Sequence, residues 1–285
     1  SIHPGVWPTM ITPFTEDNKP DFKAIEKLTD WYIEKGCAGI FAVCQSSEMA
    51  YLSEQEKLDI AKCVAETVDG RIQVVASGHT ADAKADQFKQ IENMMKIPGI
   101  GAFVLISNRL DQKNEGEEVF SRNAREIFDR YPEIDFGIYE CPMPWKRLVS
   151  LDFLRQVAPE GRMVFLKDTC CDYELIRERL KAVEGTPLKI FNANAQSWFD
   201  SFCHAPRVQR RDGQLSPGPL QVGIRPQGLR PGEGPAGSPF PHRRRHDRDA
   251  GLPRLRQVSP PADRRSHESG HPQQRCKEAG QKRQG

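Results

Sequence analysis

The 285-residue sequence lacks several features that would define a class of protein at once. No apolar run approaches the ~18 residues that a membrane span requires, and the first 14 residues lack the charged-then-apolar order of a signal peptide. The eight cysteines include no C-x-x-C pair and no finger-like histidine spacing, which excludes a disulfide scaffold and a zinc finger. We therefore expect a cytoplasmic protein with reduced thiols and no membrane contact.

Aromatic residues are nearly absent from the last part of the chain. Residues 204–285 contain no Trp, Tyr or Met and one Phe, Phe240, whereas 12 of these 82 residues are Pro and 11 are Gly. Such a segment cannot bury enough apolar surface to offset the entropy that is lost on ordering. We therefore predict two regions, a folded domain at 1–203 and a disordered low-complexity tail at 204–285.

The two regions also differ in charge. Residues 1–203 carry 24 Lys+Arg against 32 Asp+Glu, a net charge of −8, and residues 204–285 carry 17 against 7, a net charge of +10. One explanation is a frameshift near residue 203, because out-of-frame reading of a GC-rich gene gives an excess of Arg, Pro, Gly, Gln and His. The alternative is a tail that binds nucleic acid or another acidic partner, most densely at His242–His246. The lack of interleaved aromatic residues disfavours nucleic acid.

Seven short runs rich in apolar and β-branched residues recur along residues 1–203, and they begin roughly 25–35 residues apart. Each run is typical of a buried strand. The seven predicted strands are Val6–Ile11, Gly39–Cys44, Ile72–Ala76, Gly101–Ile106, Phe136–Cys141, Met163–Lys167 and Leu188–Asn192.

The intervals between these runs carry helix signals. Asp21–Lys35 places its apolar residues on one face and is followed by Gly36, a natural left-handed cap. Ser53 and Glu56 have the spacing of a capping box, which predicts that a helix begins there. Tyr173–Val183 is a further predicted helix, with its charged residues on the outer side.

This alternation of strands and helices implies a parallel sheet with right-handed crossovers. No G-x-G-x-x-G motif follows the first predicted strand, which disfavours a dinucleotide-binding fold. We predict an α/β fold, the (β/α)8 TIM barrel, whose chemistry lies at the carboxyl ends of its strands. The barrel is predicted to be incomplete, because only seven strands are recognisable and the eighth would follow Phe202.

Two polar residues end neighbouring predicted strands. Lys167 closes one strand, where desolvation would supply the neutral amine that a Schiff base requires; the alternative is a lysine paired with Asp168. Tyr139 ends the preceding strand, and the alternative there is a core tyrosine with a satisfied hydroxyl. The two are 28 residues apart, one strand–helix unit, so they are predicted to project from adjacent strands. A phenol beside an amine can carry protons during carbinolamine formation and collapse.

A polar loop, Gln45-Ser46-Ser47-Glu48, follows the second predicted strand. Hydroxyls and backbone N–H groups at such a turn can form a nest that binds a carboxylate. The alternative is an ordinary polar loop between a strand and a helix.

These residues carry a family resemblance. From about Pro4 to Phe202 the sequence resembles the dihydrodipicolinate synthase / N-acetylneuraminate lyase family of pyruvate-dependent class I aldolases. The resemblance lies in the opening segment Pro8–Phe14, in FAVCQSSE where the family has G-[TS]-[TS]-G-E, and in VVASGHT, IYECP and FLKDT. Their order and spacing agree at five strands.

The resemblance implies a mechanism and an assembly. Lys167 would form the imine with pyruvate, Tyr139 would relay protons, and Gln45 and Ser46 stand where the family grips the pyruvate carboxylate. No metal and no cofactor are implied beyond the covalent imine on Lys167. Members of the family are usually tetramers of tight dimers, so we expect a homo-oligomer.

Departures from the family pattern limit what the resemblance implies. The first Thr of the loop is Gln45 and the Gly before Glu48 is Ser47, so Ser46 is expected to supply the relay hydroxyl. Where synthases have a Tyr that reaches across the dimer, this chain has Ser107-Asn108-Arg109, and Arg109 is either an anion-binding residue or a solvated loop residue. The Arg that binds the second substrate falls at about Pro144.

We therefore predict a lyase or aldolase that forms a Schiff base with pyruvate or another 2-oxo acid and acts with an aldehyde. The departures disfavour the true dihydrodipicolinate synthase. A catalytically inactive remnant of the barrel is the alternative for this chain.

Overall fold

The computed structural model describes residues 1–195, 197, 208, 209, 215 and 216. The chain divides into two compact units, Ser1–Leu255 and Arg256–Gly285, and every described residue lies in the first. The predicted domain boundary, the place of the eighth strand and most of the tail lie outside the described residues. Within the tail, β7 (Val208–Gln209) and β8 (Leu215–Ser216) pair with each other in antiparallel register.

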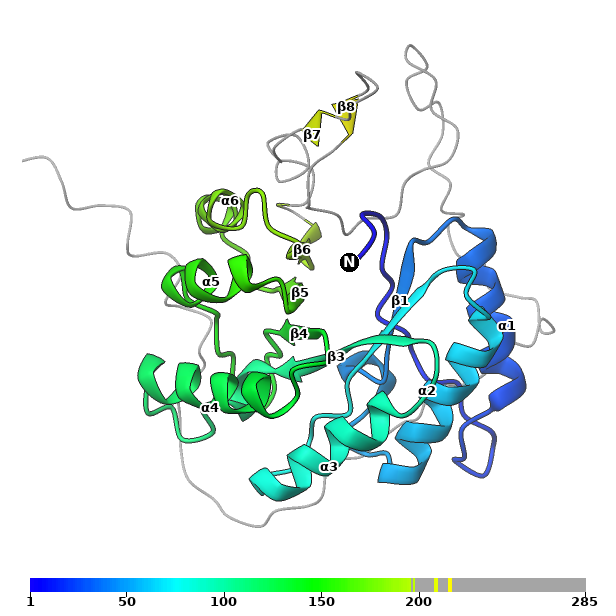
Figure 1. The fold of residues 1–285 in the computed structure, drawn as a ribbon. Coiled ribbons are helices and arrows are strands. Elements are labelled where there is room, and N and C mark those ends of the chain that lie inside the picture. Colours follow the sequence, from blue (N-terminus) through cyan, green and yellow to red (C-terminus); the bar gives the residue numbers. More distant parts are fainter. Residues whose placement is uncertain (196, 198–207, 210–214, 217–285) are drawn as a thin grey trace, which may run out of the picture. The chain divides into compact units, whose positions relative to one another are not determined.

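Six strands form one parallel sheet whose spatial order is the order along the chain. Figure 1 shows this sheet curving into part of a barrel, with helices on its outer side. Because neighbouring parallel strands need a crossover, a helix lies in the chain between each pair of consecutive strands. The strands are β1 (Gly39–Ala42), β2 (Gln73–Ala76), β3 (Ile100–Ile106), β4 (Phe136–Tyr139), β5 (Met163–Asp168) and β6 (Lys189–Asn192).

The first predicted strand continues the sheet beyond β1. Thr9 forms a parallel bridge with Phe41, and the Met10 N–H donates to the Phe41 carbonyl at 3.0 Å. The Phe41 N–H in turn donates to the Pro8 carbonyl at 3.0 Å. Six of the seven predicted strands are therefore present, and the first forms only an isolated bridge beside β1. The predicted incomplete TIM barrel is confirmed in the part of the chain that the structure describes.

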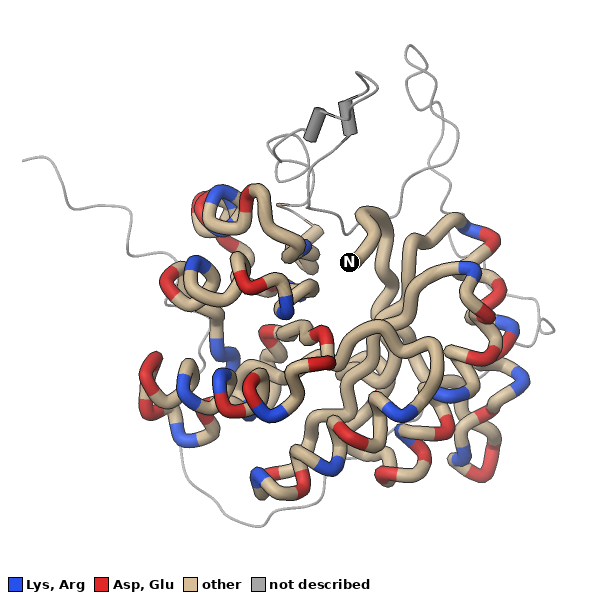
Figure 2. The backbone as a smooth tube through the Cα atoms, viewed as in Figure 1, with Lys and Arg blue, Asp and Glu red and all other residues tan. Residues whose placement is uncertain are grey.

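The helices cover the outer face of the sheet. Their bounds are α1 (Phe22–Glu34), α2 (Glu54–Val68), α3 (Lys84–Met95), α4 (Glu117–Arg130), α5 (Leu151–Val157) and α6 (Tyr173–Ala182), with short 3-10 turns η1 (Gln45–Ser47), η2 (Ser107–Arg109) and η3 (Ala158–Glu160). In Figure 2 the charged residues lie mainly on these helices and the connecting loops, while the strands carry few. Among the described residues, no helix combines the length and the apolar character that crossing a membrane would take.

Capping explains where the helices begin. The Glu56 N–H donates to the Ser53 hydroxyl at 3.2 Å, and the Ser53 N–H donates to the Glu56 carboxylate at 2.9 Å, so the predicted capping box of α2 is confirmed. In α6 the expectation that charged residues lie on the outer side is wrong for one residue. Arg179 is completely buried, because two carboxylates at the ends of β4 and β5 face it.

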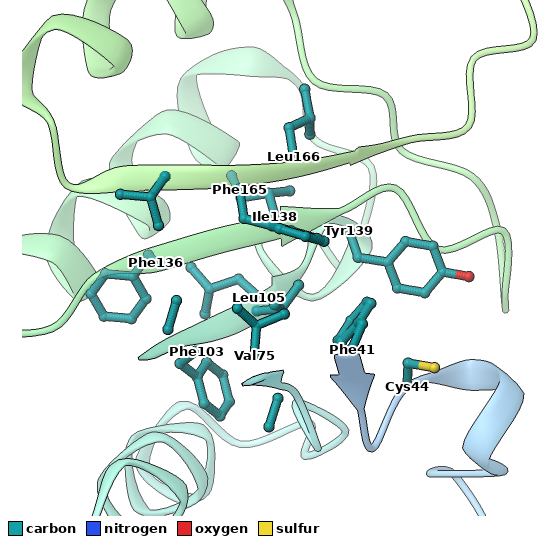
Figure 3. Close-up of a cluster of buried hydrophobic side chains, with 14 of the residues drawn as sticks. Phe41, Cys44, Val75, Phe103, Leu105, Phe136, Ile138, Tyr139, Phe165 and Leu166 are labelled. Atoms are coloured by element: carbon teal, nitrogen blue, oxygen red, sulfur yellow. The ribbon is translucent and has the colours of Figure 1, made fainter. Parts of the chain in front are cut away.

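Aromatic side chains fill the interior of the curved sheet. The Trp7 indole lies 5.6 Å from the rings of Phe165 on β5 and Phe191 on β6, and these two rings stack at 4.5 Å. Phe41 on β1 contacts Phe165 at 5.7 Å. Figure 3 shows Phe41 and Phe165 within the buried cluster and Tyr139 at its margin, with the hydroxyl pointing away from the core. The first and last strands of the sheet are thus joined through side chains.

Candidate active site

Strand register brings the two central residues of the site together. In the β4–β5 pair, Tyr139 is the register partner of Lys167, and both lie at the carboxyl ends of their strands. The Lys167 amine lies 3.9 Å from the centroid of the Tyr139 ring and 5.8 Å from that of Phe41. The predicted placement on adjacent strands therefore gives direct contact between amine and phenol ring.

The electrostatic surroundings of Lys167 favour the neutral amine. Burial lowers the pKa of Lys167, and the neighbouring thiols of Cys44 and Cys141 oppose this to a smaller extent. Among the described residues, no carboxylate lies within ion-pair distance of the amine. The alternative pairing with Asp168 is absent, because that carboxylate bonds to Arg179.

Tyr139 is buried and remains protonated. Burial, followed by the nearby Cys141 and Cys44, raises the pKa of the phenol far above its usual value. Its hydroxyl donates a hydrogen bond of 2.9 Å to the Gln45 carboxamide oxygen. The Cys141 thiol lies 3.4 Å from the same oxygen and also donates to it. Gln45 therefore presents an acceptor that already has two donors.

The loop after β1 contains residues with different surroundings. Of the three predicted binding residues in this loop, Gln45 contacts Tyr139, whereas the exposed Ser46 hydroxyl donates to Thr9 Oγ1 at 3.3 Å. Ser47 is buried, and its hydroxyl donates to the Met10 carbonyl at 2.6 Å. The hydroxyl of Ser47 thus ties the loop to the first strand.

Arg109 lies apart from this group. Its guanidinium forms an ion pair with Asp82, and the Gln112 amide donates to the Asp82 carbonyl at 2.8 Å. Arg109 and Asp82 line a hollow of about 170 Å³, to which Lys84 and Lys113 also contribute. The structure therefore does not bring Arg109 to the amine, the phenol and Gln45.

The connection after β4 is held by Asn108. Its amide nitrogen lies 3.2 Å from the Cys141 carbonyl, 2.9 Å from that of Met143 and 2.7 Å from that of Trp145. The Met143–Pro144 peptide bond is cis. Asn108, in the segment where synthases have a tyrosine, thus fixes the shape of this loop.

The thiols of Cys44 and Cys141 lie beside Lys167 and are not among the predicted site residues. Cys141 is two residues after Tyr139, a spacing that places both side chains on the same face of an extended chain. This spacing can be read from the sequence and could have predicted Cys141 as a neighbour of the site. Cys44 follows β1 by two residues and donates weakly to the Met10 carbonyl at 3.8 Å. Within the described part of the chain, no group of three or more His, Cys, Asp or Glu side chains is placed to hold a metal ion.

Comparison with known proteins finds similar sequences over part of the chain. Residues 3–107 match the model of the dihydrodipicolinate synthetase family. The 4-hydroxy-tetrahydrodipicolinate synthase of Laribacter hongkongensis is 40% identical over 169 residues, which are 57% of this chain and 56% of that protein. The chain thus spans little more than half the length of this curated relative.

Solved structures share the fold. A dihydrodipicolinate synthase of Bacillus anthracis aligns with a TM-score of 0.65 at 18% identity, over 79% of this chain and 72% of that chain. The chloride-inhibited dihydrodipicolinate synthase of Acinetobacter baumannii in complex with pyruvate aligns with a TM-score of 0.65 at 20% identity, over 78% and 70%. The resemblance that the motifs predict is confirmed by these matches to the family model and to a curated relative.

Proposed function

We propose that this chain, which is similar to the dihydrodipicolinate synthetase family, forms an imine between Lys167 and a 2-oxo acid such as pyruvate, and then reacts with an aldehyde. The observation that carries the proposal is the buried amine of Lys167, which has no carboxylate partner among the described residues and lies 3.9 Å from the Tyr139 ring centroid. The pyruvate complex of the Acinetobacter baumannii relative supports pyruvate as the 2-oxo acid.

Imine formation uses both residues. The nitrogen lone pair of Lys167 attacks the carbonyl carbon, the C–N bond forms, and the carbonyl oxygen takes a proton to give a carbinolamine. The nitrogen loses one proton as the carbinolamine forms. A second proton then reaches the carbinolamine hydroxyl, the C–O bond breaks, water leaves, and the nitrogen gives up its remaining proton to leave the imine. In each of the two transfers the Tyr139 phenol donates a proton to the oxygen and recovers one from the nitrogen, so it acts as general acid and then as general base.

Gln45 has a carboxamide where the resemblance places a threonine hydroxyl, so it cannot take the place of that hydroxyl in a chain of proton transfers. A carboxamide oxygen accepts the Tyr139 proton in a hydrogen bond but does not pass it on. We therefore assign proton transfer to Tyr139 alone, with Gln45 holding the phenol in place. The amide nitrogen of Gln45 and the exposed hydroxyl of Ser46 are the proposed donors to the substrate carboxylate. Ser47 holds the loop in place, and Arg109 does not contribute to binding this carboxylate.

The proposed second substrate is an aldehyde other than that of the true synthase. Pro144 stands where the resemblance places the arginine that holds the second substrate's carboxylate, and Met143 beside it is exposed. An aldehyde without a carboxylate at that position fits these residues better.

Trapping of the imine tests the proposal. Incubation with pyruvate and borohydride should add about 72 Da to the intact chain, and peptide mapping should locate the mass on Lys167. The Lys167→Ala variant should take up no label. Lys189→Ala is the matched control, because burial also lowers the pKa of Lys189 at the opposite end of the barrel, and this variant should label as the wild type does.

Two outcomes contradict the proposal. A folded wild-type chain without an adduct would establish the inactive remnant, and an adduct that survives in Lys167→Ala would place the chemistry elsewhere. Folding is checked by circular dichroism and a cooperative thermal transition.

We also propose that the active protein is a cytoplasmic homo-oligomer. The proposal rests on the family resemblance, and one solved neighbour is described as the first monomeric dihydrodipicolinate synthase variant. Sedimentation velocity of the purified chain distinguishes the two states: a single species with the mass of one chain would contradict the oligomer.

A further inference from the structure

A buried cluster of charges lies directly behind the amine and the phenol. Glu140 follows Tyr139 and Asp168 follows Lys167 in the chain, so the alternation of an extended backbone points both carboxylates away from the site. They meet the guanidinium of Arg179 on α6, whose side chain, like theirs, has no exposed surface. One Arg179 nitrogen bonds to Asp168, and the other lies 2.7 Å from Glu140.

The two carboxylates also hold the backbone at the strand ends. Glu140 accepts the N–H of Val149 at 2.8 Å with one oxygen and the N–H of Thr169 at 2.8 Å with the other. The Thr169 hydroxyl donates to the Glu140 carbonyl at 2.7 Å. Asp168 accepts the Cys170 N–H at 2.9 Å. The ends of β4 and β5 and the loops that follow them are therefore fixed to one another.

Stability alone does not account for such a cluster. Moving charges out of water costs several kcal/mol per ion, and replacing a buried ion pair by apolar residues is often neutral or stabilising. What the cluster provides is geometry, because a planar guanidinium bonded to two carboxylates fixes both in distance and angle. The residues that it fixes are the immediate chain neighbours of Tyr139 and Lys167.

We propose that Arg179, Glu140 and Asp168 are positioning residues that hold the Tyr139 phenol against the Lys167 amine for imine formation. The inference rests on the proposed function, because it concerns the same reaction. None of the three touches the substrate; each acts through the strand end to which it belongs. Lys167 itself faces Tyr139 on β4, Cys141 after β4 and Cys44 after β1.

Arg179→Lys is the first test. Lysine keeps the charge but cannot bridge two carboxylates with a rigid fork. The rate constant for pyruvate imine formation should fall about 10- to 100-fold, the cost of a small misplacement of reacting groups. The pyruvate concentration that gives half the maximal rate should stay unchanged, because the carboxylate donors are elsewhere. The pH midpoint of the rate should move upward, because a loosened site admits water to Lys167.

A variant at the other end of the same strand provides the control. Arg162 precedes β5 and bonds to the carbonyls of Phe128, Tyr131 and Ile134, so Arg162→Lys removes a comparable fork far from the amine. It should lower thermal stability without moving the pH midpoint. A folded Arg179→Lys variant with the wild-type rate and pH midpoint would overturn the proposal.

A second variant and a second readout complete the test. If Arg179→Lys does not fold, Glu140→Gln should lower the rate in the same direction, and an unchanged rate there overturns the proposal. If the wild type forms no imine, the proposed function fails. The pH dependence of the acetylation rate of the Lys167 amine then tests whether the three residues hold that amine in place. A midpoint that moves in the variant supports the role, and a midpoint that does not move overturns it.

Discussion

The protonation of Lys167 links the chemistry of the site to the stability of the fold. Burial lowers the pKa of Lys167 in the folded protein, whereas the unfolded chain keeps the ordinary value of 10.5. Between these two pKa values the unfolded state binds more protons than the folded state. The free energy of unfolding therefore rises with pH across that interval and is lowest below it.

Replacing Lys167 by methionine should stabilise the fold near neutral pH. Methionine fills a similar volume without a charge to desolvate, so Lys167→Met should unfold at a higher urea concentration than the wild type at about pH 7. The difference should narrow as the pH is raised toward 10.5. Urea titrations at several pH values measure it, and a difference that is constant with pH would contradict desolvation of Lys167.

Removing the Tyr139 hydroxyl should slow the reaction without disturbing the packing. The ring of Tyr139 lies edge-on to Phe41 with centroids 5.9 Å apart, and phenylalanine keeps that contact. Tyr139→Phe should lower the rate of pyruvate imine formation about 100-fold or more, the range expected for loss of a general acid–base group. Tyr131→Phe loses a hydroxyl bonded to Glu92 at 2.7 Å on the outer helices and should react at the wild-type rate. Equal rates in both variants would exclude the phenol as proton carrier.

Spacing along the chain predicted part of this site. Lys167 and Tyr139 come together because equal positions on adjacent parallel strands are register partners, which a count of residues reveals. The bond between Tyr139 and Gln45 joins residues 94 positions apart and depends on side-chain rotamers that no pattern encodes. Arg179 was missed for a different reason: a charged helical residue is normally solvated, and only the opposing carboxylates explain its burial.

At the scale of elements, the segment before α1 packs against the last two strands of the curved sheet through one side chain, that of Trp7. Trp7 is buried against Phe165 and Phe191, and the space for its ring is left by Gly39 on β1. A Cβ built on Gly39 would lie 2.3 Å from the indole, closer than any real contact. The strand carries a glycine there because a larger residue would displace the indole.

Gly39→Ala should therefore destabilise the fold by about 1–3 kcal/mol, the usual cost of overpacking a core. Gly101→Ala on β3 is the control, because its Cβ would meet only the Val74 carbonyl oxygen at an ordinary 3.5 Å. Urea unfolding should give a large loss for the first variant and little change for the second. Equal stability of the two variants would show that the indole moves aside without cost.

Sequence patterns predicted which elements exist better than where they end. The predicted strand Gly39–Cys44 ends at Ala42, because Val43 takes a positive φ of 50° and turns the chain into η1. A β-branched residue gives no sign of such a backbone conformation. The capping box of α2 was predicted correctly because side chain and backbone there bond within four residues.

At the scale of the whole molecule, the change in composition near residue 203 requires an explanation. The acidic first region, with a net charge of −8, includes residues 3–107, which match the model of a known enzyme family, and the basic region that follows has the composition expected of a shifted reading frame. The genetic code makes that hypothesis specific. With CGN codons for Arg, CTN for Leu and TCN for Ser, the codons of Val208–Ser216 read one nucleotide later contain no Arg, Pro or Gln.

The shifted frame has the character that the barrel requires. Its first codon, across Val208 and Gln209, specifies Phe, Ser, Tyr or Cys, and the next specifies Asn or Ser. The next two codons specify Val, Ala, Gly or an acidic residue, and a codon for Met or Thr follows. The codon after it specifies Val, Ala, Gly or Asp, and the run closes on Asn or Ser and a further Phe, Ser, Tyr or Cys. This is the glycine-permitting strand that the resemblance implies after the seventh strand, and the printed frame does not contain such a run.

An independent sequence of the gene should therefore lack one nucleotide that the present reading contains, shortly before the codon of Val208. Protein made from the corrected frame should unfold cooperatively and trap pyruvate more rapidly than the printed chain, because the sheet would gain the strand that pairs with the edge of β6. Intact mass of the protein from its natural source is the direct readout. A mass equal to that of the 285-residue chain would refute the frameshift. The basic tail would then be a genuine part of the molecule, and its affinity for polyanions at low and high salt would become the property to measure.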